Sequence, residues 1–188
     1  MHTTTRQNIS STTRPYVSGQ PFDENRVGAA AVYCSDGRYG EQMDDFLHAG
    51  LGLPRYDRVA VPGGAACMAG HLMVYHEKNA MEQQLAFLIK SHQLRRVVLI
   101  AHENCGFYKG LWTGGKTTEQ QQAEDLVKAA ELIRSWNVGV EVDAYFARRV
   151  DGLVAIERWS TGSEHERAKD EARPMNGKRP LPVPQPRG

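Results

Sequence analysis

The sequence has few cysteines, almost no net charge and no long hydrophobic run, and each of these absences excludes a class of protein. Three cysteines among 188 residues are few and odd in number, which argues against a secreted module framed by disulfides. No run of about 18 apolar residues is present, so the sequence predicts no membrane-spanning helix. Lys plus Arg number 23 and Asp plus Glu 22, so no net field attracts nucleic acid or an anionic membrane. We therefore expect a reducing compartment and a small-molecule partner.

The two ends of the chain differ in composition from its middle. Residues 1–22 contain no acidic side chain and are rich in Ser and Thr, which fits an organelle transit peptide or a flexible polar arm. We prefer the arm because the segment lacks an apolar helical face. Beyond Ser160 the chain is charged and then rich in proline, which is typical of an extended tail. We predict an arm over 1–25, one domain over 26–160 and a tail over 161–188. We expect a cytoplasmic protein, or alternatively one that the arm directs to an organelle or microcompartment.

Hydrophobic patterns in the middle of the chain predict strands that alternate with helices. A continuous apolar run, typical of a strand buried on both faces, covers 27–34, and two further strands are expected at 58–61 and 96–101. Apolar residues at helical spacing cover 41–49, 80–92 and 119–136. Thr118 is the expected N-cap of the last helix. Two further β-rich runs, 140–148 and 153–159, flank Asp151-Gly152, which is a hairpin signal. The predicted fold is α/β, with a mostly parallel central sheet flanked by helices and an antiparallel edge strand.

Two short motifs follow predicted strands, and together they indicate a metal site. They are Cys34-Ser35-Asp36-Gly37-Arg38 and His102-Glu103-Asn104-Cys105-Gly106. Because the carboxyl ends of parallel strands meet at one edge of a sheet, the two motifs can converge there. Zn²⁺ prefers thiolate and imidazole ligands, and a catalytic site has three of them with a fourth position for water. We therefore predict a catalytic zinc site formed by Cys34, His102 and Cys105. Each of these residues taken alone is more simply interpreted as a buried core residue.

Asp36 and Arg38 are the predicted catalytic pair beside this metal. Alternate residues of an extended segment point to the same side, which places Asp36 on the side of Cys34. A bidentate contact from Arg38 would keep the Asp36 carboxylate ionised and orient it to accept a proton from water on the metal.

The two motifs, in this order, resemble those of the β-class carbonic anhydrases, and the likeness extends over about 27–159. The resemblance implies a sheet of four parallel strands and one antiparallel strand, in a homodimer or a multiple of dimers. It implies zinc held by Cys34, His102 and Cys105, with Asp36 and Arg38 as a dyad; in some members the aspartate itself takes the fourth zinc position. The implied activity is that of a carbonate dehydratase, the reversible hydration of CO₂ to bicarbonate by hydroxide bound to zinc.

Two segments differ from the pattern of that family. Members usually carry Arg-Asn-Ala-Gly after the second strand, where this chain has Val61-Pro62-Gly63-Gly64-Ala65-Ala66. Phe107 stands where a second glycine is common. We assign Gly63, Gly64 and Gly106 to the substrate pocket; an anion-binding helix start at Gly63-Gly64 is an alternative. Two other functions stay open: hydrolysis of a CO₂-like molecule such as carbonyl sulfide or carbon disulfide, and a non-catalytic zinc-stabilised module for binding or assembly.

A few further side chains have weaker signals. Cys67 would close the metal site if it became a fourth protein ligand, but we interpret it as a small residue packed at the start of a helix. His71, His76 and His92 are proton-transfer candidates by residue type alone, and we expect them on the surface. Gln20 is a candidate for the glutamine that lines the pocket in many members of the family.

Overall fold

The computed structural model describes residues 15–71, 75–136 and 139–161, and five strands in this part of the chain form one sheet. The strands are β1 (Ala29–Cys34), β2 (Asp57–Val61), β3 (Arg96–His102), β4 (Glu141–Val150) and β5 (Leu153–Trp159), in the order β2-β1-β3-β4-β5. Pairing is parallel from β2 through β4, and β5 runs antiparallel to β4. This confirms the predicted fold class. Most of the predicted arm and tail, 1–14 and 162–188, lies outside the described residues.

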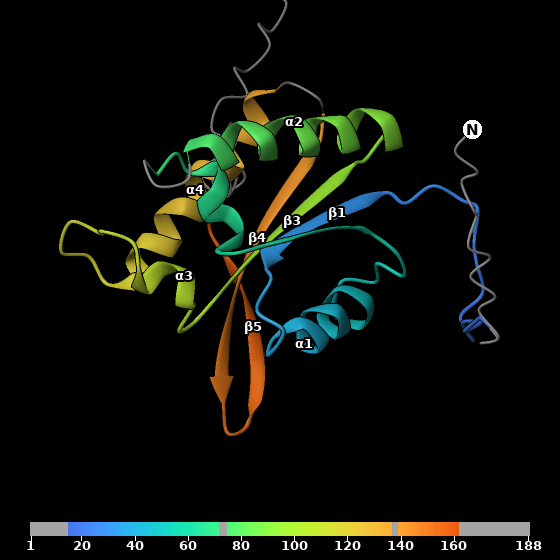
Figure 1. Ribbon diagram of the computed structural model, residues 1–188, viewed down its shortest axis with the longest axis horizontal. Coiled ribbons are helices and arrows are strands. Elements are labelled where there is room, and N and C mark those ends of the chain that lie inside the picture. Colours follow the sequence, from blue (N-terminus) through green and yellow to red (C-terminus); the bar gives the residue numbers. More distant parts are fainter. Residues whose placement is uncertain (1–14, 72–74, 137–138, 162–188) are drawn as a thin grey trace, which may run out of the picture.

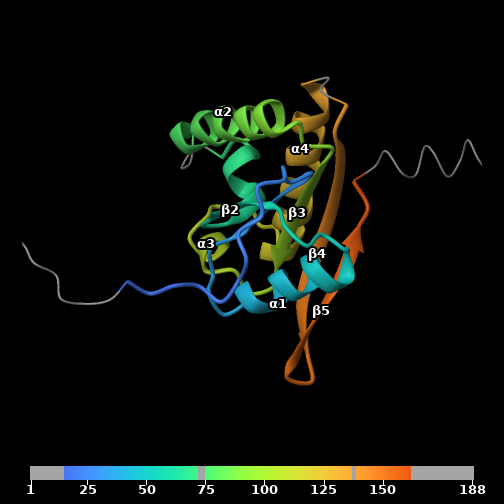
Figure 2. The ribbon, with the colours of Figure 1, turned by 90° about the vertical axis from the view of Figure 1, so that its right-hand side faces the viewer.

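Helices cover both faces of the sheet (Figures 1 and 2). The helical segments are α1 (Gly40–Asp45), a π-helical turn η1 (Phe46–Gly50), a 3₁₀ turn η2 (Gly64–Met68), α2 (Tyr75–His92), α3 (Gly106–Lys109) and α4 (Thr118–Ser135). One hydrophobic cluster joins α2, α4 and η2 to one face of the sheet, and a second joins α1 and η1 to the other. The central strands are therefore buried on both sides.

Burial on both sides explains why β1 and β3 have continuous apolar sequences. All six residues of β1 are buried. In β3, Val97 and Leu99 pack toward α2 and α4, whereas Val98 and Ile100 pack toward α1. A fully buried Val, Leu or Ile side chain contributes about 1.5–3 kcal/mol relative to an exposed one, so these strands anchor the domain. They also fix the positions of the residues that follow them.

Two local predictions were wrong in detail. The N-cap of α4 is Thr117 rather than Thr118: Thr117 Oγ1 accepts a hydrogen bond from the Gln120 backbone N–H at 3.2 Å, and the Gln120 side chain accepts one from the Thr117 N–H. This reciprocal capping box satisfies two donors where a cap at Thr118 would not. α2 begins at Tyr75, five residues before the predicted start. The prediction missed this first turn because the turn is polar and lacks an apolar stripe.

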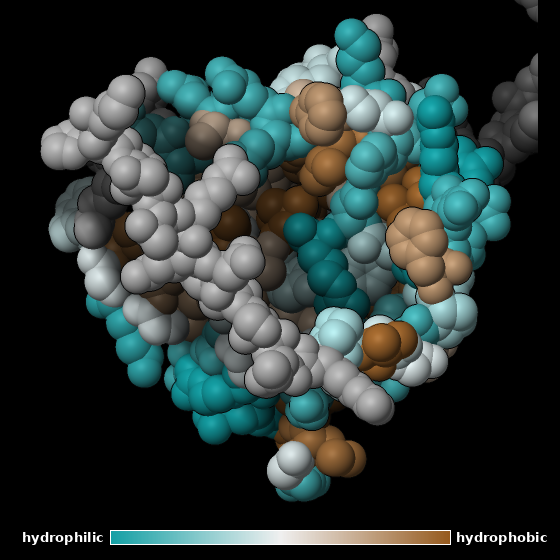
Figure 3. All heavy atoms as spheres, turned by 45° about the vertical axis from the view of Figure 1, so that its right-hand side comes forward, coloured by the Kyte–Doolittle hydropathy of each residue, from teal (hydrophilic) through white to brown (hydrophobic). Residues whose placement is uncertain are grey.

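The hairpin between β4 and β5 forms as predicted. Asp151 and Gly152 have positive φ angles of 49° and 83°, which matches the twist of a tight two-residue turn. No helix of the described residues is long and apolar enough to cross a membrane. On the face shown in Figure 3, hydrophobic residues lie mainly toward the centre and hydrophilic residues toward the rim.

Candidate metal centre

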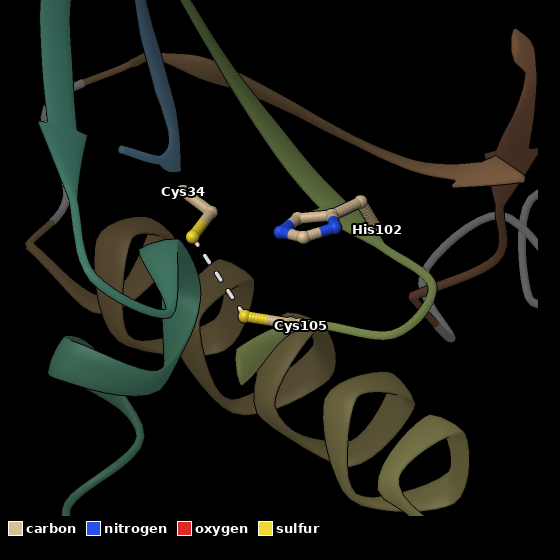
Figure 4. A group of neighbouring side chains, drawn as sticks. All are labelled: Cys34, His102 and Cys105. Atoms are coloured by element: carbon tan, nitrogen blue, oxygen red, sulfur yellow. Dashed lines mark hydrogen bonds between the residues drawn. The ribbon is translucent and has the colours of Figure 1, made fainter. Parts of the chain in front are cut away.

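Cys34, His102 and Cys105 come together at one edge of the sheet. Cys34 is the last residue of β1 and His102 the last of β3, and these strands are adjacent and parallel. Cys105 follows three residues later, so all three side chains point toward one another (Figure 4). Their candidate ligand atoms lie within 4.8 Å of one another, and all three residues are buried. The two motifs therefore converge, as expected for segments that follow the carboxyl ends of parallel strands.

The donor set fits a divalent metal ion such as zinc. His102 donates from Nδ1 to the Glu103 carbonyl oxygen at 2.9 Å, which fixes its tautomer. The other ring nitrogen, Nε2, is then an acceptor, and it is buried without a hydrogen-bond partner in the part of the chain that the structure describes. Leaving such an atom unpaired costs about 1–3 kcal/mol, which a metal ion would offset. The two sulfur atoms are 3.7 Å apart, close to the ~3.8 Å expected for two thiolates on tetrahedral zinc with Zn–S bonds of about 2.3 Å.

The two cysteines are electrostatically unequal. Contact with the Cys105 thiol lowers the pKa of Cys34, and His102 and the Gly63 N–H, 3.4 Å from Cys34 Sγ, add to this effect against the opposing effect of burial. The same contact, together with burial, raises the pKa of Cys105. The pair therefore shares one proton, and a bound cation would displace it.

Arg38 holds the Asp36 carboxylate, as predicted. The Arg38 guanidinium donates from Nε to Oδ1 at 2.9 Å and from Nη2 to Oδ2 at 2.5 Å, and the Arg38 backbone N–H adds a bond of 3.1 Å. These bonds hold the pKa of Asp36 well below its usual range. Asp36 lies outside the cluster of three candidate ligands. In this structure its carboxylate is engaged by Arg38, and its role in catalysis stays a prediction.

Tyr39 links the two motifs directly. Its ring lies 4.3 Å from the His102 imidazole, centroid to centroid, and its hydroxyl donates to the Glu103 carbonyl oxygen at 3.4 Å. Beside it, a cavity of about 230 Å³ opens next to the Asp36 and Arg38 pair. The lining residues of that cavity are Arg38, Tyr39, Asn104, Arg149 and Val154.

The glycines assigned to the substrate pocket have different surroundings. Gly63 and Gly64 both have positive φ, 78° and 54°, and a Cβ at Gly64 would lie 3.0 Å from the backbone of Tyr33. Both positions therefore require glycine. Gly106 opens α3, where a Cβ would have no atom of the described residues within 4 Å beyond its chain neighbours and its own helix. The pocket assignment itself stays a prediction.

Cys67 is placed away from the metal ligands, as the preferred interpretation held. It is buried in η2, outside the candidate cluster, and its Sγ donates to the Pro62 carbonyl oxygen at 3.4 Å. Burial raises its pKa to about 11, so this thiol stays protonated. Gln20 is exposed, and its backbone N–H bonds Ser18.

The histidines outside the motifs do not share one environment. His92 pairs with Asp57 at 2.6 Å near the end of α2, and its side chain is 41% exposed. His71 is different, because its Nε2 lies 2.6 Å from Oδ2 of Asp125, a fully buried carboxylate. The prediction that all three histidines are simple surface residues was therefore wrong for His71.

Three residues near the site were missed by the sequence analysis: Tyr108, Gln122 and Asp125. Gln122 and Asp125 are 1% and 0% exposed, on the face of α4 that also carries Leu126 and Ala129. The signal was available, since a polar residue three or four positions from buried apolar residues occupies the same helical face. Helical spacing could have singled them out, but not their partners.

The chain is similar in sequence to one protein family and to two bacterial proteins. A family model described as "Putative carbonic anhydrase" matches residues 24–156. An uncharacterized protein of Rickettsia conorii is 25% identical over 115 residues, 61% of this chain, and the match spans only 60% of that relative's length. An uncharacterized protein of Rickettsia bellii is 26% identical over 137 residues, 69% of this chain and 81% of the relative.

Solved structures with similarity include two carbonic anhydrases. The β-carbonic anhydrase isoform I of Trichomonas vaginalis has a TM-score of 0.47 and 12% identity, covering 75% of this chain and 88% of that one. The carbonic anhydrase of Glaciozyma antarctica has a TM-score of 0.47 and 16% identity, covering 72% and 83%. The family model spans more than half of the chain and includes both motifs, so the chain belongs to the carbonic anhydrase family.

Proposed function

We propose that this protein is a zinc-dependent carbonic anhydrase that interconverts CO₂ and bicarbonate. The observation that carries the proposal is the buried cluster of Cys34, His102 and Cys105, in which the His102 Nε2 has no hydrogen-bond partner among the described residues. Two thiolates and one imidazole leave a fourth coordination position open, as catalytic zinc sites do. The family to which the chain belongs supports the same reaction.

Zinc in such a site supplies hydroxide at neutral pH, because it lowers the pKa of water from 15.7 to about 7. Asp36 would contribute a hydrogen-bond acceptor at this site. An aspartate is ionised at neutral pH, and Arg38, which donates to both carboxylate oxygens, lowers the pKa of Asp36 further and fixes its orientation. A carboxyl group with so low a pKa does not store a proton, so Asp36 acts by orienting a hydrogen-bond donor toward the substrate.

The surroundings of the thiolates suit a small uncharged substrate. Ala66 and Tyr108 are buried with the two cysteines, and Phe107 and Leu111 pack against this cluster. Apolar walls suit CO₂ because CO₂ needs no hydrogen bonds from them. They also keep water molecules from competing with CO₂ for the pocket. Arg38 and Arg149 lie on the rim of the adjacent cavity, where they would favour the departing bicarbonate anion.

Phe107 supports a second candidate function on the same chemistry. Its ring packs on Gly63, whose N–H contacts Cys34, and so adds an apolar wall close to a candidate ligand. Carbonyl sulfide and carbon disulfide are larger and more polarisable than CO₂ and have the same electrophilic central carbon. Hydrolysis of either is therefore the alternative, and a non-catalytic zinc-stabilised homologue is the third outcome of the test.

The proposal is tested by zinc analysis combined with stopped-flow CO₂ hydration of the wild type and of Asp36→Asn. We expect one zinc per chain in both proteins and a loss of about 10–100-fold in hydration rate in the variant. Zinc without hydration from neutral to alkaline pH would contradict the proposal. Sulfide release from carbonyl sulfide or carbon disulfide would then identify the alternative, and its absence would leave the non-catalytic role.

Assembly and location belong to the same proposal. A homodimer, or a multiple of dimers, is the expected state, and the exposed side chains of Phe87 and Leu153, 64% and 75% accessible in the single chain, give it apolar surface to bury. Sedimentation analysis of the full chain would contradict it by finding a monomer at micromolar concentration. Cytoplasmic location is proposed from the small, odd number of cysteines, with an organelle or microcompartment directed by the N-terminal arm as the alternative. Imaging of a tagged full-length chain tests it.

A further inference from the structure

Helix α4 carries a row of buried polar residues directly behind the metal centre. Gln121, Gln122 and Asp125 are 6%, 1% and 0% exposed. A buried carboxylate is strongly unfavourable unless hydrogen bonds replace its lost hydration. Such a group is retained in a core only where its partners satisfy it, so the partners of Asp125 show what it holds in place.

Asp125 receives donors from three different segments. The Tyr108 hydroxyl donates to Oδ2 at 2.8 Å, and the Gln121 amide donates to Oδ1 at 2.9 Å. His71, which lies three residues after η2, contacts Oδ2 through Nε2 at 2.6 Å. Both carboxylate oxygens are therefore occupied, and α4 is joined to α3 and to the segment after η2.

The bond to Tyr108 fixes the segment that carries Cys105. Tyr108 belongs to α3, a helix of only four residues that begins directly after Cys105. The backbone N–H groups of Phe107 and Tyr108 face the Cys105 sulfur, where they favour the thiolate form. Because so short a helix is not stable by itself, its orientation depends on contacts such as the one between Tyr108 and Asp125.

Gln122 makes the corresponding contact to His102. Its carboxamide oxygen accepts from the His102 backbone N–H at 3.3 Å, at the point where β3 ends. The ring of His102 is held separately, by its own bond to Glu103 and by packing on Tyr39. One face of α4 thus contacts the backbone of His102 directly. Through Tyr108, the same face also contacts α3, the helix that follows Cys105.

We propose that Gln122 and Asp125 are positioning residues for the metal ligands, and that Tyr108 transmits the effect of Asp125 to Cys105. The inference rests on the metal site of the proposed function. Gln122 and Asp125 lie outside the cluster of candidate ligands; they hold His102 and Cys105 in place before a metal ion arrives. Groups that orient metal ligands in this way typically change metal affinity by about 10–100-fold.

The test measures metal affinity of the full chain rather than turnover. Tyr108→Phe removes one hydroxyl, and Gln122→Met removes the acceptor at nearly constant volume. Tyr56→Phe is the matched control, because Tyr56 also donates to a carboxylate, Asp44, in the α1 layer on the opposite face of the sheet. Zinc dissociation constants come from chelator competition, and the thiolate-to-metal absorption of the cobalt-substituted protein reports the ligand geometry.

We expect the zinc dissociation constant to rise about 10–100-fold in Tyr108→Phe and in Gln122→Met, with a weakened cobalt–thiolate absorption, and to change less than about twofold in Tyr56→Phe. Thermal unfolding of the metal-free variants shows whether each still folds. Wild-type affinity in both test variants would overturn the inference alone. An equal loss in the control would overturn it too, by showing a general effect of stability. A wild type without metal affinity would instead overturn the proposed function.

Discussion

The ring of Phe107 occupies the space that a Cβ on Gly63 would need, and it does so beside Cys34, to which Gly63 donates its N–H at 3.4 Å. These are two of the positions where the sequence departs from the usual pattern of the family. In the folded chain the two departures are in direct contact. A residue without a side chain at position 63 therefore accommodates the large one at position 107.

Gly63→Ala should destabilise the protein by about 3 kcal/mol. The substitution adds a side chain at a φ of 78° and against the Phe107 ring, and backbone strain and overpacking each cost about 1–3 kcal/mol. Urea unfolding of the two proteins measures the difference.

The double variant Gly63→Ala with Phe107→Ala separates the two causes. In the Phe107→Ala background, Gly63→Ala should cost less stability than in the wild type, because the overpacking against the ring is gone. The part of the cost that comes from backbone strain should remain. Equal losses in the two backgrounds would show that Phe107 and Gly63 do not interact.

Cys105→Ser and Cys67→Ser should differ in metal content, although both thiols are buried. Loss of Cys105 removes one of the three clustered donors, so zinc per chain after dialysis should fall to a small fraction of the wild-type value. Cys67 lies outside the cluster and should leave zinc content unchanged. Elemental analysis of both variants is the measurement, and zinc loss in Cys67→Ser would make this residue a ligand after all.

Asp44 should stabilise the fold at neutral pH and lose this effect in acid. Burial alone would raise its pKa, but hydrogen bonds from Arg58 and Tyr56 outweigh burial and lower it. A lowered folded-state pKa gives stability that is present above the unfolded value of about 3.9 and disappears as the pH falls through the folded value. Because the side chain is 32% exposed, Asp44→Asn should cost only about 1 kcal/mol.

The measurement is chemical unfolding of the wild type and of Asp44→Asn at several pH values. The difference between them should be full near pH 7 and shrink below about pH 4. A difference that is constant down to pH 2 would show that the charge of Asp44 does not contribute.

Thr117→Ala should destabilise the protein by about 1 kcal/mol, because Thr117 Oγ1 caps α4 by accepting from the Gln120 N–H. Thr118→Ala is the matched control, since Thr118 is the first helical residue rather than the cap. Its substitution should change stability by less than about 0.5 kcal/mol. Denaturant midpoints of the two variants decide the matter, and a larger loss in Thr118→Ala would reverse the assignment.

Much of the fold was predictable because its signals are local. The runs before Cys34 and His102 are continuous and apolar since both faces of β1 and β3 are covered, and this alone indicates strands of a parallel sheet. Asp151-Gly152 indicated the hairpin because the signal for a tight turn lies in the two turn residues themselves. The helix α3 was not predicted, because four residues after Cys105 are too few to show a period.

The three candidate ligands of the metal centre were predictable from the sequence, but the residues that hold those ligands in place were not. Cys34 and His102 were predicted to follow strands of one mostly parallel sheet, so both were expected at the same sheet edge; the fold decided that these two strands are neighbours. Gln122 and Asp125 lie on a helix that starts more than ten residues after Cys105, and their partners depend on how α4 packs. Sequence spacing describes which face of a helix is buried but not which atom it meets.

The sequence by itself determined the strands, the mostly parallel character of the sheet and the donor types of Cys34, His102 and Cys105, because period, turn chemistry and ligand chemistry are properties of short segments. Only the tertiary structure decided that the His102 Nε2 is left without a hydrogen-bond partner within residues 15–71, 75–136 and 139–161, that Phe107 covers Gly63 and that Asp125 supports Tyr108. These relationships join residues from separate elements, and their distances are set by the packing of the helices on the sheet.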